Sequence, residues 1–338
     1  MHLLIGIDIG GTNIKLALMD ERAHLKARRI FSTSRFSNKD SLINELVKEI
    51  KALLSGHSVP RKNLLGIGIG APGAVDVRTG TVHYLINVPN WREVPLGDIL
   101  KKKLRMPVFV DNDVNVMALG EMRFGAGRGV RNMLCITLGT GVGGGLILEG
   151  KLYRGSSYAA GEFGHVPINI EGPKCGCGSY ACVEAYVGNS YLVRDVVARI
   201  RNGEKTMITK LAGGEASKIT AKMIGIAARR GDRFARKIWI DAGNKIGVGL
   251  AGVVNLLNVE KIVIGGGVAE AGRTLFDSIR DTIAARAMKL PAKTVKIVKA
   301  KLGYDAGVIG AATLVLYELR LPAGKAGNTP NAVRNTKG

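Results

Sequence analysis

Three of the chain's four cysteines lie close together in the segment CGCGSYACVE, residues 175–184. Thiols gathered this closely either hold a metal or form a disulfide. Cys175 and Cys177 are too close in sequence to bridge each other comfortably, and cytoplasmic thiols stay reduced. Three thiolates and one neutral imidazole make a tetrahedral zinc site, and His165, shortly before Cys175, is the natural fourth ligand. The predicted Zn²⁺ ligands are His165, Cys175, Cys177 and Cys182.

Glycine-rich turns follow apolar runs at three places in the chain. Because glycine has no Cβ, backbone N–H groups in such turns can converge on an anion, and threonine hydroxyls add donors. One such turn is weak evidence, since hairpins need glycine anyway, but three in one α/β chain favour the binding of nucleotide phosphates. The chain has no Walker A sequence, and the GxGxxG dinucleotide fingerprint is not cleanly met. The turns are Gly10-Gly11-Thr12, Gly139-Thr140-Gly141 and Gly265-Gly266-Gly267.

Asp8 comes just before the first glycine turn. A carboxylate beside a phosphate is electrostatically unfavourable unless a cation lies between them. Asp8 is therefore predicted to contact Mg²⁺, directly or through water. The alternative is that Asp8 caps the turn.

Asp113 follows Asn112 at the end of the predicted strand 107–113. Phosphoryl transfer to a sugar hydroxyl needs a carboxylate that takes the hydroxyl proton, and Asp113 is the candidate for this general base. Asn112 would assist as a hydrogen-bonding partner. On this motif alone, Asp113 could equally be the N-cap of a helix that begins at Val114.

The elements that must position these residues form two similar α/β patterns. LLIGIDIGGTNIKLALMD begins at Leu3 and MLCITLGTGVGGGLILEG begins at Met133, and each predicts a strand, a tight hairpin and a second strand. We expect two similar domains that each open with this hairpin. Further strands are predicted at 64–73, 261–265 and 295–298, and helices at 42–54, 114–125, 190–201, 232–257 and 306–319. The tail after Leu321 has no periodic apolar pattern and is expected to be disordered.

The composition narrows the class of protein. The 338 residues are 46% hydrophobic, enough for a sizeable core in two domains. The net charge is +22, but the basic residues are spread along the chain with only one run of three, at 101–103, so we expect a solvated basic surface and no nucleic-acid site. The longest uncharged stretch, 133–148, is short and glycine-rich, so no membrane span is predicted. A charge as early as Asp8 does not fit a signal peptide, and a cytoplasmic location is expected.

These motifs together resemble the ROK family of sugar kinases (repressor, open reading frame, kinase), and in particular its bacterial glucokinases. The resemblance runs from about residue 3 to residue 320. It is carried by DIGGTN (8–13), GAPG (70–73), NVPNW (87–91), DNDVN (111–115), LGTGVGGG (138–145), GEFGH (161–165) and CGCGSYACVE (175–184).

The resemblance implies an α/β fold of two ribonuclease-H-like domains flanking a cleft, as in hexokinase and actin. The expected first domain is 1–115 plus 305–321, with the first phosphate loop and the catalytic Asp. The second is 116–304, with the zinc loop and the other nucleotide turns, and 322–338 is the tail. A homodimer is also implied.

The resemblance also assigns roles to residues. It makes Asp113 the catalytic base and the zinc a structural ion that holds a loop next to the sugar. His165 could serve both zinc and sugar through its two ring nitrogens. The implied sugar-binding residues are Gly73, Asn87, Asn112, Asp113, Glu162, His165 and Glu184. The implied ATP-binding residues are Asp8, Gly10, Gly11, Thr12, Asn13, Gly139, Thr140, Gly141, Gly265, Gly266 and Gly267.

Two positions depart from the family pattern. Ala181 stands where the family commonly has glycine, and if that position needs a positive φ the alanine costs about 1 kcal/mol of strain. Asn90 also replaces a frequent glycine, but asparagine tolerates left-handed backbone.

The expected activity is transfer of the γ-phosphoryl group of ATP to the 6-hydroxyl of glucose. The first alternative is a kinase for another sugar, such as N-acetylmannosamine, N-acetylglucosamine or fructose. Polyphosphate is an alternative phosphoryl donor that the basic charge makes worth testing. A sugar-responsive repressor is disfavoured, because DIGGT begins at Asp8 and leaves no room for a helix-turn-helix domain before it.

Overall fold

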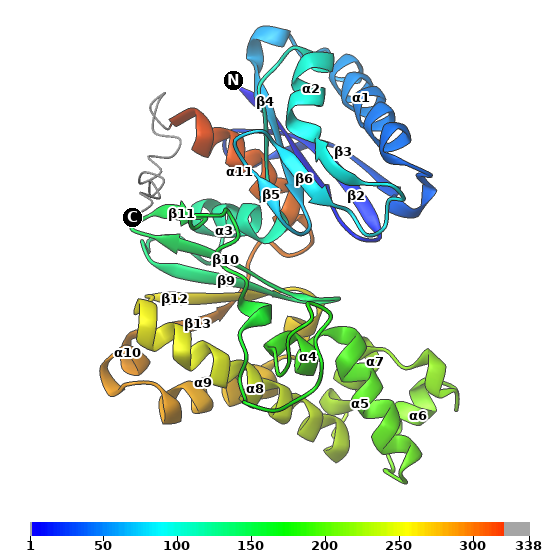
Figure 1. Cartoon of the computed structure of the whole chain (residues 1–338), viewed down its shortest axis with the longest axis vertical. Coiled ribbons are helices and arrows are strands. Elements are labelled where there is room, and N and C mark those ends of the chain that lie inside the picture. The colour runs from blue at the N-terminus through cyan, green and yellow to red at the C-terminus, as the bar shows by residue number, and fades with distance from the viewer. Residues whose placement is uncertain (1, 321–338) are drawn as a thin grey trace, which may run out of the picture. The chain divides into compact units, whose positions relative to one another are not determined.

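The computed structural model describes residues 2–320, so the predicted disorder of 322–338 lies outside the described residues. Two compact units make up the chain, and each contains one five-stranded sheet (Figure 1). The first unit comprises Met1–Gly120, Arg154–Ala160 and Tyr304–Gly338, as far as they are described, and the second comprises Glu121–Tyr153 and Gly161–Gly303. Arg154–Ala160 therefore belongs to the first unit, although the residues on both sides of it belong to the second.

The first unit is built on the predicted hairpin. Its large sheet consists of β1 (Leu3–Ile9), β2 (Asn13–Asp20), β3 (Leu25–Ser32), β4 (Leu64–Ala71) and β8 (Val108–Asn112). Their order is β3-β2-β1-β4-β8, with antiparallel pairing around β2 and parallel pairing from β1 through β4 to β8. A small sheet is formed by β5 (Val75–Asp76), β6 (Thr81–Tyr84) and β7 (Arg92–Pro95).

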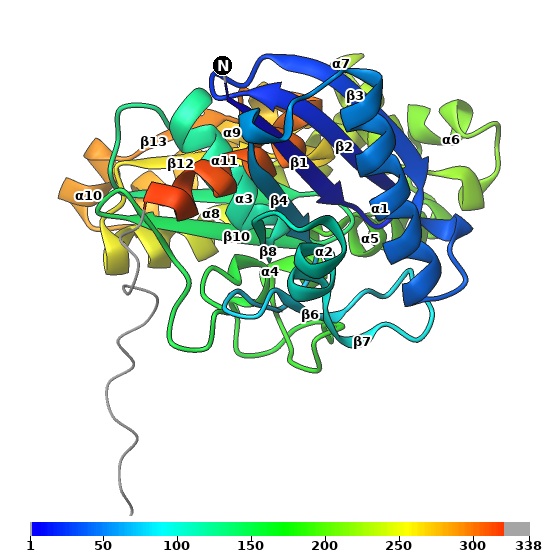
Figure 2. The same ribbon diagram turned by 90° about the horizontal axis from the view of Figure 1, so that it is seen from above.

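Helices cover both faces of the large sheet. They are α1 (Lys39–Gly56), α2 (Leu96–Leu104) and α11 (Ala306–Arg320), with α3 (Asp113–Phe124) following β8. Because residues alternate along a strand, Ile5 and Ile7 share an apolar core with α1, whereas Gly6 faces α11. A Cβ on Gly6 would overlap the carbonyl oxygen of Val308, so only glycine lets the backbone of α11 lie this close to β1. Figure 2 shows α1 beside β1 and β2.

The second unit repeats this sheet. Its strands are β9 (Met133–Leu138), β10 (Val142–Leu148), β11 (Lys151–Tyr153), β12 (Lys261–Gly265) and β13 (Lys296–Lys299). Their order is β11-β10-β9-β12-β13, again with an antiparallel hairpin followed by parallel strands. The same order and directions in both sheets confirm the expected pair of ribonuclease-H-like folds.

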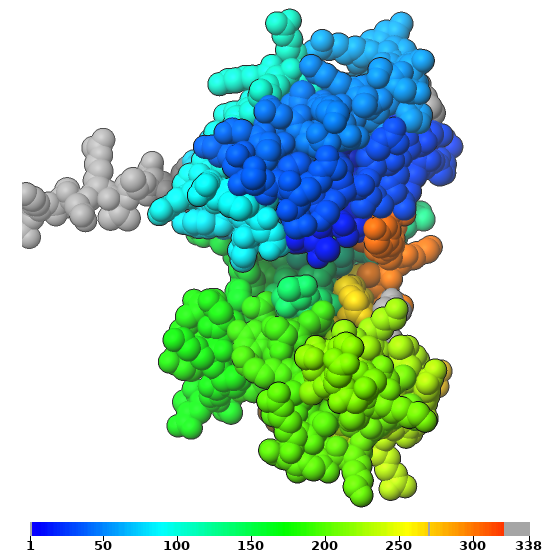
Figure 3. Space-filling model, turned by 90° about the vertical axis from the view of Figure 1, so that its right-hand side faces the viewer, coloured from blue at the N-terminus to red at the C-terminus, as the bar shows by residue number. Residues whose placement is uncertain are grey.

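Helices of the second unit pack mainly around one long helix. They are α4 (Val183–Val187), α5 (Asn189–Arg201), α6 (Met207–Leu211), α7 (Ala221–Arg229), α8 (Arg233–Leu257), α9 (Arg273–Arg286) and α10 (Lys289–Thr294). Glycines in α8 allow a close approach to α9: a Cβ on Gly243 would lie 2.8 Å from the carbonyl oxygen of Leu275. On the side drawn in Figure 3, yellow-green residues of α5 to α7 form much of this unit's surface, and blue N-terminal residues form much of the first unit's.

The predicted helices 114–125, 190–201, 232–257 and 306–319 are found as α3, α5, α8 and α11, within one residue at each end. Short 3-10 turns connect several elements, at Thr33–Arg35, Arg61–Asn63, Phe163–His165, Ala216–Lys218, Gly267–Ala271 and Gly303–Asp305. Within residues 2–320, no helix combines the length and the apolar character that a membrane crossing requires.

Candidate active site

In the first unit, the candidate catalytic pair stands where β8 runs directly into α3. The side-chain oxygen of Asn112 accepts hydrogen bonds from the backbone N–H of Val114 at 2.8 Å and of Asn115 at 3.2 Å. Asn112 is therefore the residue that caps α3, and the idea that Asp113 is the N-cap is wrong. Asp113 is instead the first residue of the helix, with a partly buried side chain whose Oδ1 accepts from Val114 N–H at 2.9 Å.

The amide group of Asn112 also links this strand end to a neighbouring loop. Its Nδ2 donates to the carbonyl oxygen of Gly73 at 3.1 Å, and Gly73 adopts a φ of +78°, which favours glycine. Gly73 and Asn112, both predicted to touch the sugar, are thus brought together.

Asn87 lies against the first phosphate turn. Its Nδ2 donates to the carbonyl oxygen of Gly11 at 2.7 Å, and a Cβ on Gly11 would lie 2.8 Å from that nitrogen. The turn is closed by the N–H of Gly10, which donates to the carbonyl of Asn13 at 3.0 Å. In the same NVPNW loop, Asn90 has a φ of 58°, as expected of an asparagine in place of glycine. A predicted sugar residue and a predicted phosphate turn therefore share one hydrogen-bonded arrangement.

Asp8, the next-to-last residue of β1, lies beside this turn and pairs with Lys15, whose Nζ lies 3.5 Å from Oδ2. Burial raises the pKa of the Asp8 carboxyl, and the charge of Lys15 opposes that effect. Lys15 also donates to the carbonyl of Tyr304 at 3.1 Å. A lysine therefore provides the positive charge next to Asp8 in this structure, and the contact of Asp8 with Mg²⁺ stays a prediction.

In the second unit, the four predicted zinc ligands form one cluster. The ligand atoms of His165, Cys175, Cys177 and Cys182 all lie within 4.8 Å of one another. His165 Nδ1 is 3.7 Å from the sulfur of Cys175, and the sulfurs of Cys177 and Cys182 are 3.8 Å apart. A tetrahedron with Zn–S bonds of about 2.3 Å places its sulfurs about 3.8 Å apart, so the donor set fits zinc. All four cysteines are free thiols, so no disulfide competes.

Two thiols of the cluster have pKa values that are shifted in opposite directions. The backbone N–H of Ser179 lowers the pKa of the Cys177 thiol. Burial, with a hydrogen bond that the Cys182 thiol donates to the sulfur of Cys177, raises the pKa of Cys182 to about 12. A metal that binds all three sulfurs must therefore displace a proton from Cys182.

Ala181 adopts a φ of 54°, which confirms that this departure from glycine sits at a left-handed position. Its side chain is fully buried, and a Cβ on Gly172 would lie 2.8 Å from the Ala181 methyl carbon. The buried methyl group of Ala181 therefore contributes packing that opposes the cost of its left-handed backbone.

Glu184 ties the cysteine loop to the second phosphate turn. It follows Cys182 in α4, and its Oε2 accepts from the backbone N–H of Val142 at 2.8 Å. A Cβ on Gly141 would lie 2.7 Å from the same oxygen. The N–H of Asn189, at the start of α5, donates to the carbonyl of Gly139 at 3.0 Å. The helices that follow the cysteines therefore hold the Gly139–Gly141 turn from one side.

The third phosphate turn lies beside the second. β9 and β12 are parallel neighbours, and a Cβ on Gly266 would overlap the backbone of Leu138, the residue before Gly139. A Cβ on Gly139 or Gly267 would meet no atom within 4 Å. Two of the predicted phosphate turns thus end neighbouring strands and leave open space, as an anion site at such an edge requires.

The predicted residues divide between the units. The first unit holds Asp8, Gly10, Gly11, Thr12, Asn13, Gly73, Asn87, Asn112 and Asp113. The second holds Gly139, Thr140, Gly141, Glu162, His165, Cys175, Cys177, Cys182, Glu184, Gly265, Gly266 and Gly267. Sequence reasoning gave no role to Asp111, although its place just before Asn112 at a strand end was a signal for one.

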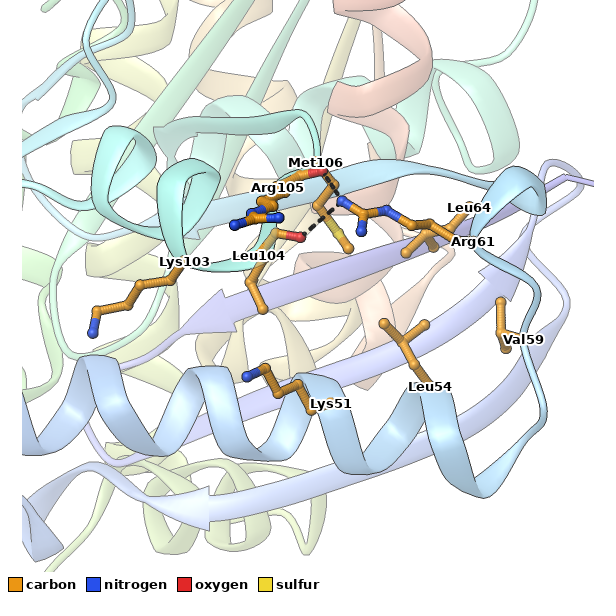
Figure 4. Close-up of a pocket in the computed structure, with 9 residues that line it drawn as sticks. All are labelled: Lys51, Leu54, Val59, Arg61, Leu64, Lys103, Leu104, Arg105 and Met106. Atoms are coloured by element: carbon orange, nitrogen blue, oxygen red, sulfur yellow. Dashed lines mark hydrogen bonds between the residues drawn. The ribbon is translucent and has the colours of Figure 1, made fainter.

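One pocket of the first unit contains no predicted site residue. Its volume is about 310 Å³, and it is lined by Lys51, Leu54, Val59, Arg61, Leu64, Lys103, Leu104, Arg105 and Met106. Figure 4 shows Arg61 reaching the carbonyl oxygens of Leu104 and Arg105 at the end of α2, while the Lys103 amine points away. Arg61 therefore closes the C-terminal end of a helix, and the pocket is assigned no ligand.

These two sheets and their strand-end turns define a fold of the actin and hexokinase type. The chain belongs to the ROK family, whose family model matches residues 4–318. It is similar to a glucokinase from Halalkalibacterium halodurans, with 37% identity over 312 residues, 92% of this chain and 94% of that protein.

Solved structures and regulators of the family are also similar. A ROK family glucokinase from Streptomyces griseus, in complex with glucose and AMPPNP, aligns with a TM-score of 0.78 at 36% identity, covering 92% of this chain and 98% of that one. A xylose repressor from Caldicellulosiruptor bescii is 30% identical over 316 residues, 94% of this chain and 78% of the repressor. The family therefore includes both enzymes and regulators that resemble this chain.

Proposed function

We propose that this protein is a glucokinase that transfers the γ-phosphoryl group of ATP to the 6-hydroxyl of glucose, with Asp113 as the general base. The broader assignment, an ATP-dependent sugar kinase, follows from its family and from the glucokinases that resemble it over most of their length. The choice of glucose and the residue roles belong to the proposal.

The proposal rests on the different positions of Asn112, which caps α3, and Asp113, which is the first residue of that helix. Because Asn112 caps α3, the fold does not need Asp113 for that purpose. A carboxylate at the first position of a helix is favoured by the helix dipole, and it can accept the proton of a sugar hydroxyl placed within hydrogen-bonding reach. For phosphoryl transfer, the protein mainly has to supply this base, position the two substrates and stabilise the charge on the transferred phosphoryl group.

Sugar recognition is proposed for polar groups of both units. In the first unit these are Gly73, Asn87, Asn112 and Asp113. In the second they are Glu162, His165 and Glu184. The Nδ1 atom of His165 faces Cys175, which leaves Nε2 for a sugar hydroxyl.

A Zn²⁺ ion is proposed at His165, Cys175, Cys177 and Cys182, where it would supply a structural cross-link and no catalytic chemistry. The spacing of the four donor atoms supports this ligand set. The hydrogen bond from Val142 N–H to Glu184 connects this loop to the phosphate turn. An ordered cysteine loop would therefore also help to order the turn.

The ATP phosphates are proposed to bind at the glycine turns, with Asp8 as a contact for Mg²⁺. Open space at Gly139 and Gly267 supports the location of the anion site in the second unit. A homodimer is also proposed, as is a division into domains 1–115 plus 305–321 and 116–304, from which the compact units differ at 116–120, 154–160 and 304.

A coupled assay with ATP and a panel of hexoses and acetylhexosamines tests the proposal. We expect glucose to give the highest kcat/KM. A preference for N-acetylmannosamine or N-acetylglucosamine would replace glucose with another substrate. Sugar binding without turnover of any of these sugars would instead favour a regulator. Replacement of ATP by polyphosphate in the same assay tests the alternative donor, for which we expect little activity.

A further inference from the structure

A buried ion pair stands directly behind the candidate catalytic pair. The Nε of Arg154 donates to Asp111 Oδ2 at 2.7 Å, and its terminal nitrogen donates to Glu318 at 2.6 Å. The Asp111 side chain is 1% exposed and that of Arg154 is 15% exposed. Charges this deeply buried are costly unless they are paired and hydrogen-bonded.

The other oxygen of Asp111 holds the strand end. Asp111 Oδ1 accepts from the backbone N–H of Asn112 at 2.7 Å and from the side-chain Nδ2 of Asn115 at 2.8 Å. Asn115 lies one helical turn further on, and its own N–H donates to the Asn112 side chain. Asp111 therefore fixes the junction between β8 and α3 from behind, on both sides of Asp113.

Arg154 itself is held by several contacts within the first unit. It is the first residue of the segment Arg154–Ala160, and its carbonyl accepts from Ala160 N–H at 3.0 Å. Its guanidinium lies 5.7 Å from the centre of the Tyr317 ring on α11. Burial disfavours the charged guanidinium, but Asp111 and Glu318 outweigh it and raise the pKa of Arg154.

We propose that Arg154 is a positioning residue that acts through Asp111 to set the orientation of Asn112 and Asp113. This inference rests on the proposed role of Asp113 as the base. Without Arg154, the buried Asp111 carboxylate has no countercharge and must turn toward water, which releases Asn112 N–H and Asn115. A displacement of about 1 Å in a reacting group can reduce turnover by about 10²-fold.

The test compares Arg154→Met, Arg154→Lys and a matched control, Arg78→Met. Arg78 pairs with Asp76 in the same unit and lies over the Tyr158 ring, but its side chain is 62% exposed and it makes no hydrogen bond or ion pair with Asp111, Asn112 or Asp113. We expect kcat to fall roughly 10- to 100-fold in Arg154→Met, and the sugar KM to rise as well, because Asn112 is itself proposed to bind the sugar. Arg154→Lys should recover part of the lost kcat, because it restores the positive charge but not the simultaneous hydrogen bonds to Asp111 and Glu318. Arg78→Met should match the wild type.

Hydrogen exchange of the peptide that contains Asn112 gives a second readout that needs no activity. The Asn112 amide should exchange faster in Arg154→Met than in the wild type and in Arg78→Met. Equal exchange in all three proteins would overturn the proposal, as would wild-type kcat in Arg154→Met. A wild type that phosphorylates no sugar would refute the proposed function, while the exchange data would still decide whether Arg154 holds the strand end.

Discussion

Glu184 accepts a hydrogen bond from the backbone N–H of Val142 at 2.8 Å. This contact joins the helix that follows the last cysteine of the metal cluster to the turn between β9 and β10. A residue proposed to bind the sugar thereby also orders a turn proposed to bind the nucleotide. Substitutions at Glu184 should therefore affect both substrates, but not equally.

Glu184→Gln and Glu184→Ala separate these two roles. Glutamine keeps an oxygen for Val142 N–H but loses the charge, whereas alanine loses both. Hydrogen bonds to charged groups contribute about 1.5–3 kcal/mol, so both variants should raise the sugar KM roughly 10- to 100-fold. Only Glu184→Ala should also raise the ATP KM clearly. Equal ATP KM values in the two variants would show that the Val142 contact does not order the turn.

Metal analysis of the purified protein should find about one zinc per chain. Cys177→Ser should lose the metal and weaken sugar binding more than ATP binding, because Glu162, His165 and Glu184 flank the cysteine loop. Because Cys182 has a pKa of about 12 in the metal-free protein, a proton must leave on metal binding, and zinc affinity should fall as the pH is lowered. Full activity in metal-free protein would refute the structural role of the metal.

Asp8→Asn should separate stability from function. Burial raises the pKa of Asp8, so the folded state binds this proton more tightly than the unfolded state does. The stabilising contribution of that proton is present below the ordinary pKa and is lost as the pH rises through the folded-state pKa. At pH 7 the variant should therefore be at least as stable as the wild type, with a smaller difference near pH 4, while turnover drops sharply. Chemical denaturation at both pH values measures this, and a clear loss of stability at pH 7 would contradict it.

Ala181→Gly should be nearly neutral for stability. Relief of the left-handed strain at φ 54° favours glycine by about 1 kcal/mol, and loss of the buried methyl group costs about 0.8 kcal/mol. The free energy of unfolding should therefore change by less than about 0.5 kcal/mol. A change above about 1.5 kcal/mol in either direction would mean that either the strain or the packing of the methyl group dominates at this position.

The sequence predicted most of what local patterns determine. The hairpins at Leu3 and Met133, the long helix ending at Leu257 and the His165–cysteine cluster all follow from periodicity, glycine placement or close spacing. Contacts between distant segments were not predictable in this way. Arg154 meets Asp111 and Glu318 across 43 and 164 residues, and no local pattern encodes such a pairing.

The helix cap shows a different limit. Asn112 and Asp113 are both good capping residues, so the sequence could not say which of them caps α3. The choice depends on where β8 ends, because that sets which side chain points back at the first free N–H groups. The structure gives that position to Asn112.

The turnover of Asp113→Asn tests the central claim most directly. The substitution keeps the size of the side chain and leaves the Asn112 cap in place, so the free energy of unfolding and glucose binding should stay close to wild type. Loss of the base should lower kcat for glucose by about 10²–10⁴-fold. Near-normal kcat in a folded, glucose-binding Asp113→Asn protein would contradict the assignment of Asp113 as the general base.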